Sequence, residues 1–386
     1  MNNFTYYNPV RAYFGKYALD ELGGAVAPFG KRVLLAYGGG SIKRSGLYDK
    51  IMDILKDAGK EVFELPGVMP NPRTEKVYEG IALCREKNVD FLLAVGGGST
   101  IDCCKAISVG ACTDQDFWKT FYERGEAAEK ALPLGVVLTL PATGSEMDMS
   151  SVITNWKTSE KNSYDSPLTF PKFSILDPTL TYTLPKNQTV NGIVDTMSHV
   201  FELYLSPPDE DNLTDRLAEG VLHTIIPAAR TVMKDPTNYD ARANLMWCSS
   251  FTLCGMLNNG KNTDWASHCI EHPLSAVFDV PHGAGLAVIH PNYMKYICPW
   301  AVERFERFAR RIWAVDPAGK TQEQVAMEGI ERTQAFFREL GAPTTLTELG
   351  IKESDLAHLA QLTDLSCWSY QKLTREDVRA ILEMSL

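Results

Sequence analysis

The sequence predicts an N-terminal α/β domain of the Rossmann-like type followed by an all-helical C-terminal domain. Over residues 1–183 short apolar runs alternate with amphipathic segments, the pattern of strands joined by helices in a largely parallel sheet. Over residues 184–386 apolar residues recur at spacings of three and four, as in amphipathic helices. A length of 386 residues also favours two domains.

The strands expected in the first part are short runs rich in β-branched and other apolar residues. They cover residues 32–37, 61–65, 90–95, 134–140, 151–154 and 173–176. Helical patterns near 44–58, 74–87 and 100–110 separate the early strands. In such a sheet, ligands bind at the carboxyl ends of the strands.

The second part is expected to consist of helices only. They cover about 187–206, 213–233, 239–258, 264–278, 300–312, 322–340, 353–362 and 375–384. Leu184-Pro185-Lys186 is the expected joint between the two parts. The acidic residues 207–211 are expected to form a solvated loop between helices.

Composition excludes several classes of protein. A net charge of −10 argues against nucleic-acid binding, which needs clustered lysine and arginine. No apolar run approaches the roughly 18 residues of a membrane span, and the first residues lack the features of a signal peptide. Nine cysteines without a CxxC motif suit reduced thiols in a cytoplasmic protein.

Two glycine clusters follow predicted strands and precede predicted helices. They are Gly38-Gly39-Gly40-Ser41 and Gly96-Gly97-Gly98-Ser99. Glycine lets the backbone approach a phosphate, and a helix N-terminus offers free N–H groups. Either cluster alone could be a tight turn without a ligand. Together with a third polar turn at residues 141–145, they favour a dinucleotide.

The first glycine turn also indicates which nicotinamide cofactor fits. An acid at this point would hold a ribose 2′-hydroxyl and repel a 2′-phosphate. The turn has no carboxylate, and Ser41, Lys43 and Arg44 are nearby donors. The sequence therefore predicts NADP(H) over NAD(H).

An acid and four histidines occur at spacings that suit one metal ion. Asp195 and His199 are one helical turn apart, as are His268 and His272, and His282 follows in a Pro-His-Gly segment. Residues at i and i+4 share a helix face, so their side chains can converge. A single histidine in an apolar helix is more often a core residue. The set as a whole, imidazole nitrogens with one carboxylate, predicts an Fe²⁺ or Zn²⁺ site.

Several stretches together resemble the iron-containing (group III) alcohol dehydrogenases, and most closely their NADPH-dependent butanol dehydrogenase and aldehyde reductase branch. The matching stretches are residues 37–51, 95–107, 140–155, 176–185, 192–202, 267–276 and 281–291. The resemblance implies a Rossmann-like and a helical domain, an active site in the cleft between them, and a homodimer. It also implies reversible, metal-dependent reduction of aldehydes to primary alcohols with NADPH.

The resemblance also assigns roles to single residues. The family's metal ligands fall on Asp195, His199, His268 and His282. His272 falls close to the metal, and we expect it to relay the final proton because an imidazole titrates near neutral pH. Cofactor contacts fall on Gly38, Gly39, Ser41, Asn71, Gly97, Gly98, Ser99, Asp102, Thr139, Thr143, Lys161 and Tyr182.

Some of these roles have alternatives. Lys161 could be solvated, Tyr182 could pack at the domain joint, and Asp102 could interact with a helix dipole. Many relatives have TAGTGSEVT where this chain reads ATGSEMD, which leaves the role of Asp148 open.

Two other functions stay open. Glycerol dehydrogenases and dehydroquinate synthases share the two-domain plan, and the latter are lyases. A lyase for a multiply charged substrate needs several basic residues near the metal, yet residues 187–206 and 262–294 contain none. A pocket of this kind favours simple aldehydes. The other alternative is a regulator that binds nucleotide and metal without turnover.

Overall fold

The computed structural model describes residues 1–367 and 369–386, and the chain divides into two compact units. One comprises residues 7–184 and 236–254, and the other comprises residues 1–6, 185–235 and 255–386. The boundary at Leu184 lies at the joint that the sequence predicts.

Residues 236–254 differ from the predicted division, because they belong to the α/β unit rather than to the helical one. This segment contains α8 (Tyr239–Phe251). Met246 of α8 joins the apolar core of the α/β unit, and the Ser250 hydroxyl donates a hydrogen bond to Glu146 at 2.5 Å. The helical periodicity of α8 was predicted, but its packing partner depends on contacts that are distant in sequence.

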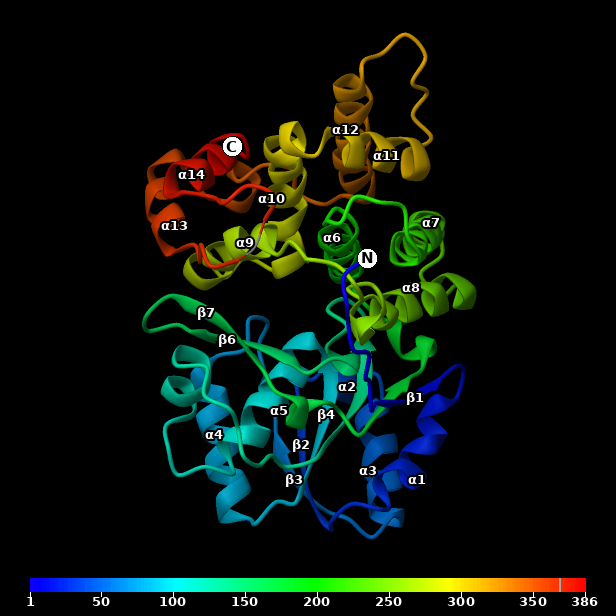
Figure 1. The fold of residues 1–386 in the computed structure, drawn as a ribbon. Helices are drawn as coiled ribbons and strands as arrows, with labels where there is room; N and C mark the ends of the chain where they lie inside the picture. The colour runs from blue at the N-terminus through cyan, green and yellow to red at the C-terminus, as the bar shows by residue number, and fades with distance from the viewer. Residues whose placement is uncertain (368) are drawn as a thin grey trace. The chain divides into compact units, whose positions relative to one another are not determined.

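A parallel sheet forms the centre of the α/β unit (Figure 1). It has six strands in the order β1-β8-β5-β4-β2-β3. Five strands match the prediction closely: β2 (Arg32–Tyr37), β3 (Glu61–Leu65), β4 (Phe91–Gly97), β5 (Leu134–Leu140) and β8 (Phe173–Leu176). The edge strand β1 (Arg11–Phe14) was not predicted, because its four residues are at most partly buried and do not form a fully apolar run like that of β8.

A separate two-stranded antiparallel sheet consists of β6 (Ser150–Asn155) and β7 (Glu160–Asp165). The sequence predicts β6 but not β7. The segment EKNSYD of β7 is polar, so backbone pairing with β6 rather than its own composition makes it a strand.

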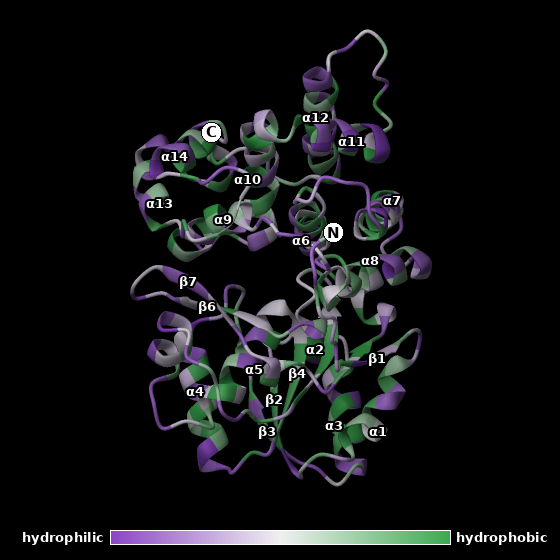
Figure 2. Cartoon of the chain, in the orientation of Figure 1, coloured by the Kyte–Doolittle hydropathy of each residue, from purple (hydrophilic) through white to green (hydrophobic). Residues whose placement is uncertain are grey.

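Alternate residues of β2 face opposite sides of the main sheet, as the pleat requires. Leu34 packs in the core formed with α4 (Thr74–Glu86) and α5 (Gly98–Gly110). Leu35 packs in the core formed with α1 (Leu22–Val26) and α3 (Leu47–Asp57). The central strands are therefore hydrophobic along their length, as Figure 2 shows.

The second unit is helical, as predicted. Its α-helices are α6 (Lys186–Tyr204), α7 (Leu213–Lys234), α9 (Ala266–Phe278), α10 (His282–Ile297), α11 (Val302–Trp313), α12 (Gln322–Leu340), α13 (Leu356–Leu362) and α14 (Arg375–Glu383). The helix α10 is absent from the predicted set, because glycines near its start and Pro291 weaken its helical pattern. Within the described residues, no helix is long and apolar enough to cross a membrane.

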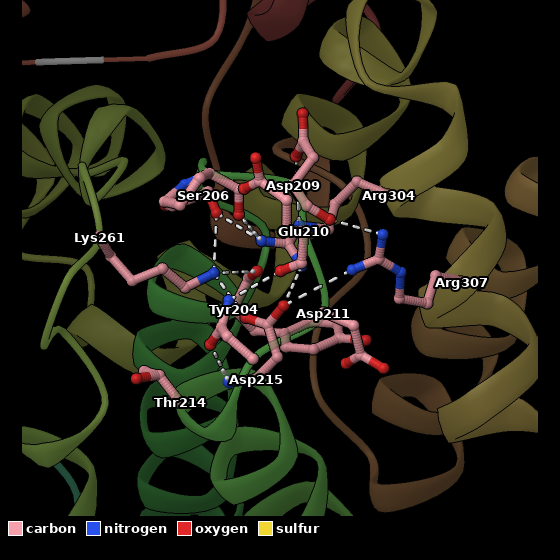
Figure 3. Close-up of polar contacts among 12 residues, drawn as sticks. Tyr204, Ser206, Asp209, Glu210, Asp211, Thr214, Asp215, Lys261, Arg304 and Arg307 are labelled. Atoms are coloured by element: carbon pink, nitrogen blue, oxygen red, sulfur yellow. Dashed lines mark hydrogen bonds and ion pairs between the residues drawn. The ribbon is translucent and has the colours of Figure 1, made fainter. Parts of the chain in front are cut away.

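Buried ion pairs hold the segment between α6 and α7 (Figure 3). The carboxylate of Asp215 lies 2.5 Å from Lys261 Nζ and also contacts Arg304 of α11, and all three side chains are almost fully buried. Arg304 also donates to the carbonyl oxygens of Ser206 at 2.6 Å and Pro208 at 2.9 Å. Burial, together with the nearby Arg304 charge, lowers the pKa of Lys261 to about 8, although Asp215 opposes the shift.

Cys269 of α9 and Cys367 form a disulfide, where the sequence predicts reduced thiols. The two residues are 98 positions apart, so no local motif indicates the pair. The other seven cysteines carry free thiols.

Candidate metal centre and cofactor site

Asp195 of α6, His268 of α9 and His282 at the start of α10 converge within the helical unit. Oδ1 of Asp195 lies 3.9 Å from Nε2 of His268 and 3.7 Å from Nε2 of His282. One ligand atom from each of the three residues lies within 4.8 Å of the other two. Ligand atoms around a tetrahedral ion at about 2.1 Å are about 3.4 Å apart, so the three could hold one ion after small adjustments.

His199, the fourth predicted ligand, lies beside this group but is not part of it. Its ring centroid is 4.5 Å from that of His268. Its Nδ1 is 2.8 Å from the backbone oxygen of Asp195, one turn earlier on α6, so Nε2 is the nitrogen left for an ion. Burial, together with the charge of His268, holds the pKa of His199 well below its usual value. A neutral imidazole is the form that binds a metal.

Close packing of the start of α10 against α6 and α9 places His282 beside the other candidate ligands. An added Cβ on Gly283 would lie 2.7 Å from the carbonyl carbon and 2.8 Å from the Cα of Asn191 on α6. An added Cβ on Gly285 would lie 2.6 Å from Oε1 of Glu271 on α9. Both glycines therefore allow the start of α10 to approach its neighbours.

Two buried glutamates contact Nδ1 of His268 and His282, the ring nitrogens that do not face Asp195. The sequence analysis did not predict these glutamates. Oε2 of Glu202 is 2.5 Å from Nδ1 of His268, and Oε2 of Glu271 contacts Nδ1 of His282. Each pair joins two different helices, so sequence spacing carries no signal for it. Burial raises the pKa of Glu202 well above its usual range, although Ser267 opposes the shift by donating a hydrogen bond. A nearby cation would favour the ionised form of Glu202.

His272, the predicted proton relay, is half-buried next to the ligand group. Its ring centroid lies 5.9 Å from that of His282. The role of His272 as a proton relay stays a prediction. His290 packs in the helical core, where its Nδ1 lies 2.8 Å from the Ser267 hydroxyl.

The donor chemistry fits a divalent ion. A single carboxylate with imidazole nitrogens is intermediate in softness, and both Fe²⁺ and Zn²⁺ accept such ligands. Both Asp195 and His268 are buried, so an ion held there would be largely shielded from water.

In the α/β unit, the second glycine turn and the third polar turn pack together. The strand β4 ends at Gly97, and α5 starts at Gly98. An added Cβ on Gly98 would lie 2.5 Å from Oγ1 of Thr143, and one on Gly97 would lie 3.0 Å from Cβ of Leu140. The glycines that were predicted to approach a phosphate therefore also make room for the turn that carries Thr143.

The predicted cofactor residues Asn71 and Lys161 also meet. Nζ of Lys161 is 3.3 Å from Oδ1 of Asn71. The predicted residues Ser99, Thr139 and Tyr182 are half-buried.

Asp102 and Asp148 form hydrogen bonds or an ion pair with other residues of the α/β unit. The buried Asp102 accepts hydrogen bonds from the Ser145 hydroxyl at 2.6 Å and the Val152 N–H at 3.0 Å. Burial raises the pKa of Asp102 to about 6, although Lys105 opposes the shift. Asp148 pairs with the buried Lys105 at 2.6 Å. Both acids thus hold the third turn against α5, and a direct cofactor contact of Asp102 stays a prediction.

The first glycine turn is accessible. Gly38 is half-buried, Gly39 is exposed, and Ser41 is the exposed first residue of α2 (Ser41–Arg44). Gly40 has a φ of 89°, a conformation that favours glycine. Nζ of Lys43 lies 3.4 Å from Glu64 of β3, and this carboxylate also accepts hydrogen bonds from Tyr37 and Tyr48.

Two family models together match almost the whole chain. Residues 9–178 match the model "Iron-containing alcohol dehydrogenase", and residues 189–386 match "Fe-containing alcohol dehydrogenase family, C-terminal". The chain belongs to the iron-containing alcohol dehydrogenase family.

Curated relatives define the branch of this alcohol dehydrogenase. The chain is 48% identical over 388 residues to the probable NADH-dependent butanol dehydrogenase 1 of Bacillus subtilis (strain 168), and the alignment covers 100% of both chains. It is 39% identical to the NADPH-dependent aldehyde reductase YqhD of Escherichia coli (strain K12), which covers 93% of this chain and 92% of the relative. The NADH-dependent butanol dehydrogenase A of Thermotoga maritima has the same fold, with a TM-score of 0.95, 39% identity and coverage of 100% and 99%. These relatives confirm the predicted butanol dehydrogenase and aldehyde reductase branch.

Proposed function

We propose that this alcohol dehydrogenase reduces aldehydes to primary alcohols, reversibly, with NADPH as hydride donor and one divalent metal ion. The observation that carries the proposal is the convergence of Asp195, His268 and His282 on one point of the helical unit. Membership of the family and the names of the relatives support the same reaction.

The protein's part in the reaction is to bind and orient the substrate and the cofactor, and to exclude water. Asp195, His199, His268 and His282 are the proposed ligands, and a divalent ion held by them supplies Lewis-acid chemistry at a carbonyl or alcohol oxygen. With Asp195 as the one carboxylate among its ligands, a divalent ion would remain electron-poor, which favours negative charge on that oxygen. His272 is proposed to pass the last proton toward solvent.

The α/β unit is proposed to hold the cofactor. The N-terminus of α5, with Gly97, Gly98 and Ser99, would take the pyrophosphate. Gly38, Gly39 and Ser41 would lie at the adenosine ribose. Asn71, Asp102, Thr139, Thr143, Lys161 and Tyr182 complete the proposed set.

The proposed preference for NADPH rests on the first glycine turn. It carries no carboxylate, and the nearby Glu64 already accepts hydrogen bonds from two tyrosines. The names of two relatives at 48% and 49% identity favour NADH instead. The ratio of kcat/KM for the two cofactors decides between them, and equal or better efficiency with NADH would exclude the NADPH preference.

Fe²⁺ and Zn²⁺ both fit the ligands, so metal analysis of anaerobically purified protein is needed. The same protein, supplied with NADPH and a series of short- and medium-chain aldehydes, should lose the absorbance of the reduced nicotinamide. A non-catalytic regulator would bind NADPH without this loss. A dehydroquinate synthase-like lyase would leave simple aldehydes unreduced, whereas a glycerol dehydrogenase-like enzyme would prefer glycerol as the alcohol.

We also propose a cytoplasmic homodimer that binds neither nucleic acid nor membrane. The family resemblance supports the dimer, and the net charge of −10 argues against nucleic acid. Light scattering coupled to gel filtration tests the oligomeric state.

A further inference from the structure

Two of the candidate metal ligands, His268 and His282, contact buried carboxylates through the ring nitrogen that does not face Asp195. His268 faces Glu202 through Nδ1 at 2.5 Å, and His282 faces Glu271 through Nδ1. The side chains of Glu202 and Glu271 are only 1% and 0% exposed. His199 differs, because its Nδ1 faces a backbone oxygen.

A carboxylate behind an imidazole selects one tautomer. An ionised carboxylate can only accept, so Nδ1 carries the proton and Nε2 keeps its lone pair. In both histidines Nε2 is the nitrogen turned toward Asp195, at 3.9 Å and 3.7 Å from its Oδ1. The two glutamates therefore prepare the nitrogens that face the candidate ion.

The glutamates are themselves held in place by the protein. Oε1 of Glu202 accepts hydrogen bonds from the Ser267 hydroxyl at 2.5 Å and the His268 N–H at 3.1 Å. Oε1 of Glu271 accepts from the Ser275 hydroxyl at 2.5 Å. Gly285 leaves space for the Glu271 carboxylate. The positions of both carboxylates thus follow from helix packing.

We propose that Glu202 and Glu271 are positioning residues of the metal centre, which fix the Nε2-binding tautomers of His268 and His282 and raise the affinity for a divalent cation. Their charge adds to that of Asp195 in a buried site, where Coulomb interactions are only weakly screened. Carboxylates that orient a ligand histidine contribute about 10- to 100-fold to metal affinity. The proposal rests on the proposed metal ligands but not on the identity of the aldehyde.

The test uses Co²⁺ as probe, because its visible absorption reports the number and type of ligands. Metal-free full-length protein is titrated with Co²⁺ in competition with a chelator, for the wild type, Glu202→Gln and Glu271→Gln. Each Gln variant should bind Co²⁺ about 10- to 100-fold more weakly and change its spectrum. Ser275→Ala removes the hydroxyl that donates to Glu271 and to the Val280 carbonyl oxygen but keeps the Glu271 carboxylate, so it should have a smaller effect in the same direction.

Glu146→Gln is the matched control, because Glu146 is an equally buried glutamate of the α/β unit. Its Co²⁺ affinity and spectrum should equal those of the wild type. NADPH binding by all variants reports whether the α/β unit is intact. If both Gln variants and Ser275→Ala bind Co²⁺ as tightly as the wild type, with the same spectrum, the positioning role is wrong while the metal site stands. If the wild type binds no Co²⁺, the metal site and the proposed function fail together.

Discussion

Replacing Gly283 by alanine should impair the enzyme by moving His282, without touching a ligand. The added Cβ would lie 2.7 Å from the carbonyl carbon of Asn191, whereas ordinary contacts begin at 3.4 Å. The obstructing atoms are backbone atoms of α6, so they cannot rotate away. The carbonyl oxygen of Asn191 lies nearer still to the added Cβ, so the start of α10 must shift by more than about 0.7 Å, the difference between these two distances.

A shift of this size matters because His282 is the first residue of α10. A misplacement of about 1 Å at a reacting centre can cost about 100-fold in rate. We expect Gly283→Ala to lower kcat/KM for butanal by roughly 10- to 100-fold. Overpacking should also lower the free energy of unfolding by about 1 to 3 kcal/mol.

The assay is steady-state NADPH oxidation with butanal, alongside Co²⁺ titration and urea unfolding. Gly220→Ala is the matched control, because Gly220 is an exposed residue within α7 with no atom within 4 Å of an added Cβ. That variant should keep the wild-type rate and gain about 0.5 to 1 kcal/mol of stability. A Gly283→Ala enzyme with wild-type kcat/KM and Co²⁺ affinity would refute the packing argument.

Three further predictions concern stability, each measured by urea unfolding. Burial raises the pKa of Glu146 from its ordinary value of 4.5 to about 7. The folded protein therefore binds an extra proton between these pH values and loses stability as the pH rises through them. Relative to Glu146→Gln, the free energy of unfolding of the wild type should fall by about 2 kcal/mol between about pH 5 and pH 8. A difference in unfolding free energy between the two proteins that stays constant over this range would contradict the prediction. Asp215→Asn should cost about 3 to 5 kcal/mol, because it removes the buried anion that Lys261 and Arg304 both contact. Arg216→Ala should cost less than about 1 kcal/mol, because the Arg216 side chain is exposed in its ion pairs. Cys367→Ser should cost about 2 to 4 kcal/mol, since the disulfide closes a loop of 98 residues. Cys112→Ser at a free, exposed thiol should have no effect, and equal stability of both serine variants would count against the disulfide.

Local patterns in the sequence were enough to predict most of the elements. The strand β2 is apolar along its length because both faces of the sheet are covered, so it was recognisable from composition. The glycine turns at 38–41 and 96–99 followed from their position between a strand and a helix. The spacing of Asp195 and His199 was enough to predict a shared helix face, because the helical period is local.

Tertiary packing decided the features that depend on contacts between distant segments. The polar β7 is a strand only because it pairs with β6, and α8 belongs to the α/β unit through Met246 and Ser250. Neither assignment can be read from periodicity, because a period does not identify the partner.

The candidate site shows the same division. Residue types and spacings in the sequence indicated a metal and named Asp195, His199, His268 and His282. Only the packing of three helices brought Asp195, His268 and His282 within 4.8 Å of one another and left His199 beside them. The pairing of Glu202 with His268 also depends on that packing, because the two residues lie on different helices and their side chains come into contact only when α6 and α9 meet.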